Sequence, residues 1–219
     1  LITLWAIRSF AIGDLDVAVT TPVEAAACVA FITLMIPTVA IVGRDGGGQL
    51  SLALTFTPHR GRLIAARILA LVFVMSIAAV IAVVVVGTVA VVLAGGKYAE
   101  LAALIVPFVA VAAMTWTAFV AAITLLVRRG FVAVLILLVG FILLPLLLSS
   151  FGGVLPEFLR EVSNQVLLYS PVTFAFDSVA LTKSTVLGIG PLLLSQLGLA
   201  VWSAIGVALS SWVFVRRSF

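Results

Sequence analysis

The residue types that most often perform catalysis or bind metals are scarce in this sequence. It contains one histidine, His59, and one cysteine, Cys28, far apart in the chain. A zinc site takes three or four such ligands, and a serine or thiol nucleophile needs a histidine base beside it. His59 lies between Pro58 and Arg60, so we interpret it as a solvated loop residue. We therefore expect no metal site, no bound cofactor and no catalytic residue in this chain.

The phosphate-binding P-loop is missing as well. That motif, Gly-x-x-x-x-Gly-Lys-Ser/Thr, holds phosphates with backbone amides and a lysine. The two lysines occur as Gly96-Lys97-Tyr98 and Thr182-Lys183-Ser184, and neither context fits. We do not expect this chain to bind ATP through such a motif.

The polar groups inside the long apolar runs are mild. No acidic residue lies in the interior of these runs, which argues against proton- or sodium-driven transport. We interpret the hydroxyl and amide groups mainly as hydrogen-bonding partners of neighbouring helices or of the carbonyl four residues earlier. The alternative is contact with a transported substrate. The candidates for such a pathway lining are Thr33, Thr38, Thr115 and Thr117.

The elements that carry these residues are predicted to be membrane helices. Hydrophobic residues make up 64% of the chain and charged residues 9%, with a mean hydropathy of +1.41. Soluble domains are about half apolar and roughly a quarter charged. We therefore predict an all-α, polytopic transmembrane bundle, with residues 1–219 as one domain. The net charge of +4 does not indicate nucleic acid, because the arginines flank apolar runs in short loops.

A membrane-spanning helix needs roughly 20 mainly apolar residues. The segment Leu1–Ile7 is too short, and we expect it to be the end of a preceding helix, which would give six spans in total. The five visible spans are predicted at Ala25–Gly43, Leu63–Ala94, Leu101–Val127, Phe131–Phe151 and Val186–Val215.

The charges between the spans predict their orientation. Every second connection is basic, namely residues 44–67, 128–129 and 216–217, whereas the other connections carry mixed charges. Because basic loops stay on the cytoplasmic side, we expect a multi-pass protein of the cell membrane with a cytoplasmic C-terminus.

Two stretches outside the spans are distinctive. In the first, Gly46–Gly48 precedes Gln49–Thr57, whose alternating apolar residues fit a strand as well as a helix. Pro58 and Gly61 are expected to interrupt whatever forms there. In the second, residues 156–168 carry apolar side chains at helical spacing, which predicts a short amphipathic helix at the outer face.

These two stretches resemble segments of the type-2 ABC exporter permeases. Residues 45–69 resemble the segment after that family's second helix, with an acidic residue and glycine, a leucine-rich helix, Thr-Pro and basic residues. Residues 170–181, Ser-Pro-Val-Thr-Phe-Ala-Phe-Asp-Ser-Val-Ala-Leu, resemble the signature Asn-Pro-Leu-Thr-Tyr-x-x-Asp-Ala-Leu before its last helix. Ala180 departs from the pattern, in which a basic residue is usual. The resemblance covers essentially the whole chain.

The resemblance implies a permease subunit without enzymatic activity of its own. Such a subunit pairs with a second permease, identical or related, and with two nucleotide-binding ATPase subunits that hold ATP and Mg. It also implies a coupling helix within residues 45–62 and an outer helical hairpin, the gate, within residues 152–183. The implied ATPase-coupling residues are Asp45, Gln49, Leu50, Leu52, Leu54, Phe56, Arg60 and Arg62. The implied gate residues are Pro156, Phe158, Pro171, Thr173, Phe174 and Asp177.

Two other functions stay open at this point. One is a non-transport membrane scaffold or immunity-type protein that binds a partner in the bilayer. The other is a secondary transporter, although the sequence offers no ion site inside the spans. For an exporter, a pathway without charged residues indicates an amphipathic or lipophilic cargo such as a drug, a lipid or a peptide.

Overall fold

The computed structural model describes residues 15–44, 60–93, 99–127, 129–143, 147, 157–180 and 190–217. All regular secondary structure in these residues is helical, which confirms the predicted all-α class. The elements are α2 (Leu15–Arg44), α4 (Arg60–Leu93), α5 (Ala99–Val127), α6 (Gly130–Leu135), the π-helical segment η2 (Ile136–Leu143), α8 (Glu157–Leu168), α9 (Pro171–Asp177) and α11 (Gly190–Arg217).

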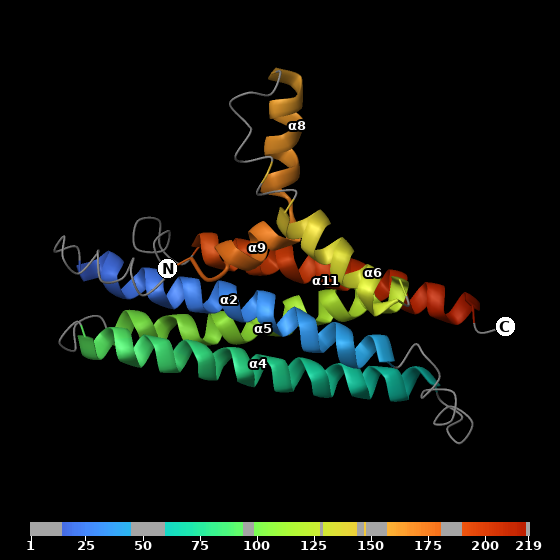
Figure 1. Cartoon of the computed structure of the whole chain (residues 1–219), viewed down its shortest axis with the longest axis horizontal. Helices are drawn as coiled ribbons and strands as arrows, with labels where there is room; N and C mark the ends of the chain where they lie inside the picture. The colour runs from blue at the N-terminus through green and yellow to red at the C-terminus, as the bar shows by residue number, and fades with distance from the viewer. Residues whose placement is uncertain are drawn as a thin grey trace.

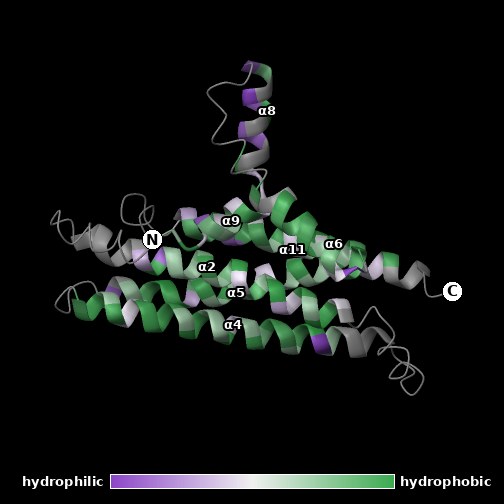
Figure 2. Ribbon diagram, viewed as in Figure 1, coloured by the Kyte–Doolittle hydropathy of each residue, from purple (hydrophilic) through white to green (hydrophobic). Residues whose placement is uncertain are grey.

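Four of these helices are long and apolar enough to cross a membrane. The stretches are Pro22–Gly43 in α2, Ala65–Leu93 in α4, Ala102–Val127 in α5 and Gly190–Val213 in α11. Figure 2 shows their largely hydrophobic surfaces. A helix satisfies its own backbone hydrogen bonds, which is why apolar stretches of this length adopt it in lipid. These four agree with four of the five predicted spans.

The predicted span Phe131–Phe151 is not confirmed. Its described part consists of α6, with 6 residues, and η2, with 8 residues. Together they are shorter than the roughly 20 residues that a span needs. Between Leu143 and α8 the structure describes only Leu147, so the count of five spans is not confirmed.

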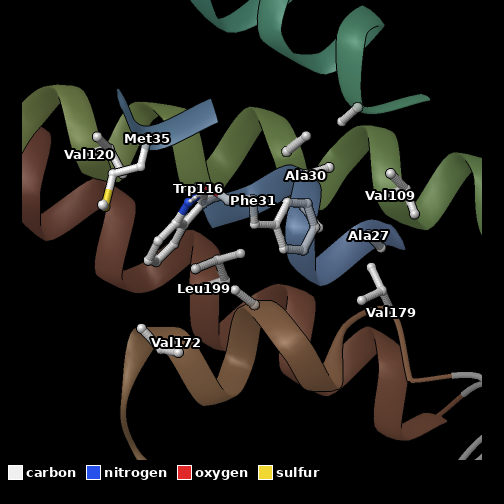
Figure 3. Close-up of a cluster of buried hydrophobic side chains, with 14 of the residues drawn as sticks. Ala27, Ala30, Phe31, Met35, Val109, Trp116, Val120, Val172, Val179 and Leu199 are labelled. Carbon is white, nitrogen blue, oxygen red and sulfur yellow. Dashed lines mark hydrogen bonds between the residues drawn. The ribbon is translucent and has the colours of Figure 1, made fainter. Parts of the chain in front are cut away.

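Helix α5 is the centre of the bundle. It packs against α2, α4 and α11, while α9 packs against α11 and α6 packs against α2. Figure 1 shows α4 along one side of the bundle and α6, α9 and α11 along the other. The main core lies between these layers, where Figure 3 shows Trp116 of α5 beside Phe31 of α2. Both side chains are almost fully buried.

Small residues let the helices approach one another closely. A Cβ atom built on Gly43 at the end of α2 would lie 3.2 Å from the Cα of Gly130 in α6. One built on Gly206 of α11 would lie 3.2 Å from the Cβ of Ala122 in α5. In lipid the hydrophobic effect contributes little to helix association, so close van der Waals packing of this kind is its main source of stability.

Candidate functional site

The threonine hydroxyls of the predicted pathway are largely engaged within their own helices. The Oγ1 of Thr33 donates a hydrogen bond to the Val29 carbonyl at 2.8 Å. Thr38 donates to Leu34 at 2.7 Å, and Thr115 donates to Val111 at 2.9 Å. These bonds agree with the structural interpretation favoured from the sequence, in which each hydroxyl returns to the carbonyl four residues earlier.

Thr117 differs from the other three. Its side chain is buried, and its Oγ1 has no hydrogen-bond partner in the described part of the chain. Thr33 lies in an apolar groove of about 320 Å³ between α2 and α4, and Thr38, Thr115 and Thr117 are not among the residues that line it.

Polar side chains join the neighbouring helices to the backbone of α5. Ser76 of α4 donates to the Ala110 carbonyl at 3.0 Å, and Gln196 of α11 donates through Nε2 to the Phe108 carbonyl at 2.8 Å. Ser203 of α11 donates to the Thr115 carbonyl at 2.6 Å. The predicted helix–helix hydrogen bonding is thus confirmed for Ser76 and Gln196.

Trp116 supplies a corresponding bond from α5 to α2. Its Nε1 donates to the Phe31 carbonyl at 3.0 Å, in a fully buried position. Sequence reasoning missed this residue, although an indole N–H within an apolar run needs an acceptor and was a usable signal. The ring of Phe119, tilted against Trp116 with ring centroids 5.7 Å apart, extends the contact toward α11. There Trp202 meets Phe119 edge-on, with ring centroids 6.3 Å apart.

The predicted gate residues separate into two groups. On α9, Pro171 is buried and Thr173, Phe174 and Asp177 are half-buried, whereas Phe158 on α8 is 75% exposed. Pro156 lies outside the described residues. Helices α8 and α9 follow each other as expected for a hairpin, but they are not among the helix pairs that pack substantially against each other.

Helix α9 is built by local signals in the sequence. Ser170 caps its first turn by accepting a hydrogen bond from the Val172 amide at 3.3 Å, and Pro171 occupies the first helical position, where no amide donor is needed. Trp202 of α11 donates through Nε1 to the Tyr169 carbonyl just before the cap, at 2.9 Å. The segment before α9 is therefore attached directly to α11.

The predicted coupling residues Asp45, Gln49, Leu50, Leu52, Leu54 and Phe56 lie outside the described residues. Arg60 and Arg62 belong to the first turn of α4, which begins at Arg60. Gly61 lies inside that turn, while the element that Pro58 and Gly61 were expected to interrupt, residues 49–57, lies outside the described residues. A first turn tolerates glycine because its amides have no acceptor within the helix.

Basic residues from distant parts of the sequence gather at one end of the bundle. Helix α2 ends at Arg44, α4 begins at Arg60, Arg129 precedes α6, and α11 ends at Arg217. These helix ends lie together at the end that contains the C-terminal part of α11 (Figure 1). Glu100, in the first turn of α5, lies at the opposite end.

No protein-family model, curated protein or solved structure shows a significant match to this chain. Any assignment of function to this chain must therefore rest on the geometry of the described helices. Within the ranges that the structure describes, no three histidine, cysteine, aspartate or glutamate side chains are grouped to hold a metal ion.

One acidic residue lies closer to the membrane than the sequence indicated. The apolar stretch of α2 begins at Pro22 rather than at the predicted Ala25, and it therefore includes Glu24 near its start. This position is at the end of the stretch, where a charged side chain can extend to the interface. Glu24 thus lies at the end of the apolar stretch and not in its interior.

Proposed function

We propose that this chain is the transmembrane permease subunit of an ATP-driven ABC exporter in the cell membrane. Two permeases form the translocation pathway, and separate ATPase subunits bind and hydrolyse ATP with Mg. The observation that carries the proposal is the relative position of α2 and α4. Helix α2 ends at Arg44 and α4 begins at Arg60, both at the basic end of the bundle. Residues 45–59, which connect the two helices, therefore start and finish at that end.

This arrangement supports a docking surface for a soluble partner at that end. The same end carries Arg129 and the C-terminal end of α11. In the proposal this end is cytoplasmic, as the positive-inside rule requires. An ATPase that binds residues 45–59 then acts on α2 and α4 together, and both of these helices pack against α5.

The contacts between α9 and α11 support a gate formed by α9. Phe174 of α9 packs against Gly198 of α11, and the Trp202 indole holds the Tyr169 carbonyl. Because α9 is attached to α11 at two points, a shift of α11 moves α9 with it. ATP drives the cycle by binding one conformation of the assembled exporter more tightly than the other.

The cargo class follows from the surfaces that the helices present. The groove between α2 and α4 is lined by apolar residues and the back-bonded Thr33. A pathway of this character takes an amphipathic or lipophilic molecule, because it offers no fixed charge to a polar solute.

The decisive experiment is affinity purification of this chain from its native membrane in a mild detergent, with bound proteins identified by mass spectrometry. We expect a stoichiometric ATPase with a P-loop, together with a second permease chain. A parallel purification of another ABC complex from the same membranes controls for detergent damage. If that control keeps its ATPase and this chain has none, the permease assignment is wrong and the membrane scaffold is the better explanation.

A further inference from the structure

The segment between α8 and α9 lies beside the middle of the apolar stretch of α11. The Tyr169 carbonyl accepts the hydrogen bond of Trp202, which is at the middle of the 24-residue apolar stretch Gly190–Val213. A helix of that length extends about 36 Å, close to the thickness of a bilayer's hydrocarbon core. If α11 spans the membrane, Tyr169 therefore lies near the bilayer midplane.

Helix α9 runs from this depth toward the start of α11. Phe174, in the middle of α9, contacts Gly198, which is one turn closer to Gly190 than Trp202 is. The path from Tyr169 through Phe174 thus leads from the midplane toward the end of the bundle where α11 begins.

Helix α8 leaves the bundle at the same depth. Figure 1 shows it projecting from the side of the bundle, across the direction of α11. None of the substantial helix–helix contacts among the described residues involves α8. Five of its polar side chains are exposed, and Figure 2 shows hydrophilic positions along this helix. The five side chains are Glu157, Arg160, Glu161, Asn164 and Gln165.

Lipid cannot cover α8 at this depth. Charged side chains at the level of the hydrocarbon core are strongly disfavoured and normally face other protein or a water-filled cavity. The other face of α8 is apolar, with Phe158 and Val162 both exposed. A covering surface must therefore offer apolar packing on one side and charged or polar groups on the other, as a protein does.

The charges of α8 indicate which protein surface can cover it. Arg160 and Glu161 are adjacent, and Glu157 lies one turn before them. Two identical helices that cross in opposite directions around a two-fold axis near these residues can place each Arg160 beside a glutamate of the other copy. A surface that is complementary to itself in this way is the requirement for a symmetric dimer.

We propose that α8 is the arm through which two copies of this chain associate, with the charged faces of the two α8 helices in contact inside the membrane. The inference rests on the proposed function in that it identifies the second permease as a copy of this chain. Each α8 then lines a polar space between the two bundles. The long apolar helices alone would not form such a space.

Cysteine cross-linking tests this arrangement in native membranes. The full chain carries one cysteine, so a Cys28→Ala background permits single cysteines elsewhere. Asn164→Cys puts a thiol on the polar face of α8 and leaves every charge in place. Ile205→Cys is the matched control, since Ile205 is exposed on α11 one turn from Trp202 and hence at similar depth. Mild oxidation should convert most of the Asn164→Cys protein into a disulfide-linked dimer and leave Ile205→Cys monomeric.

Charge exchange provides the second measurement. Arg160→Glu should lower the dimer yield of the Asn164→Cys protein at least five-fold, and the added Glu161→Arg change should restore it. The proposal is overturned if Asn164→Cys stays monomeric, if it links only to a different protein, or if the double exchange does not restore the yield.

The same samples separate the two proposals. Cross-linked homodimers that carry no ATPase would contradict the exporter assignment and leave the role of α8 standing. A chain that purifies with an ATPase but does not cross-link through α8 would contradict the role of α8 and leave the exporter assignment standing.

Discussion

The ring of Phe174 occupies the space in which a side chain on Gly198 would lie. A Cβ atom built on Gly198 would approach three ring carbons of Phe174 at 2.7 to 2.8 Å, closer than real Cβ atoms come to other heavy atoms. Helix α9 can therefore lie this close to α11 only because residue 198 has no side chain. The attachment of the proposed gate to the last helix depends on this pair and on the nearby Trp202–Tyr169 hydrogen bond.

The substitution Gly198→Ala should displace α9 and destabilise the protein by about 1–3 kcal/mol, the usual cost of overpacking. Unfolding in SDS, followed by far-ultraviolet circular dichroism, measures the change. Gly190→Ala is the matched control, because nothing lies within 4 Å of a Cβ atom built there. Adding Phe174→Leu to Gly198→Ala should recover most of the loss, and equal stability of Gly198→Ala and wild type would contradict the contact.

Trp116→Phe should destabilise the contact between α2 and α5. The change removes the Nε1 donor to the Phe31 carbonyl but keeps an aromatic ring beside Phe119. Hydrogen bonds between membrane helices contribute about 1 kcal/mol, and the smaller ring adds a packing loss of similar size. The same SDS titration should show a total loss of about 2 kcal/mol, and a loss below about 0.5 kcal/mol would show that the bond is not formed in the membrane.

Thr117→Val should leave stability unchanged or raise it by up to about 1 kcal/mol, because a buried hydroxyl without a partner is replaced by a methyl group of similar size. Transport by the proposed exporter, once purified, should also be unchanged if Thr117 is a core residue. A several-fold fall in transport with unchanged stability would instead show that Thr117 lines the pathway. Thr33→Val, in the apolar groove, provides the comparison.

Charge reversal at the start of α4, Arg60→Glu together with Arg62→Glu, should release the proposed ATPase. We expect the amount of ATPase retained in the affinity purification to fall at least ten-fold, because two basic residues at this end become acidic and would repel a surface that binds the remaining arginines. Membrane insertion should persist, as measured by the amount of chain in the membrane fraction. Glu100→Arg, at the opposite end of the bundle, should retain the ATPase. Full retention in the double reversal would contradict the docking surface.

Hydropathy predicted the long helices well because it is a local property of the chain. The observed apolar stretches of α2 and α5 begin within a few residues of the predicted spans, at Pro22 and Ala102, and end at the predicted Gly43 and Val127. The run Phe131–Phe151 is equally apolar, yet its described part forms the short α6 and the π-helical η2. Composition alone does not give the length of a helix, since a short apolar helix and a span can have the same residue types.

The polar residues show the limits of sequence reasoning more clearly. A threonine in a helix always has a carbonyl four residues before it, so the bonds of Thr33, Thr38 and Thr115 were predictable. The unpartnered hydroxyl of Thr117 and the identity of the Trp116 acceptor, the Phe31 carbonyl, were not. Both depend on which residue of another helix lies opposite, and periodicity contains no information about that.

The sequence by itself determined that this chain forms apolar helices and which of their ends are basic, because length, hydropathy and charge act within each segment. Only the tertiary structure decided that α5 lies at the centre, that Phe174 fills the space at Gly198, and that α8 leaves the bundle beside the middle of α11. In lipid, almost any face of an apolar helix can be buried at similar cost. Packing of small and large side chains, and the acceptors available to a few polar groups, therefore selected the arrangement.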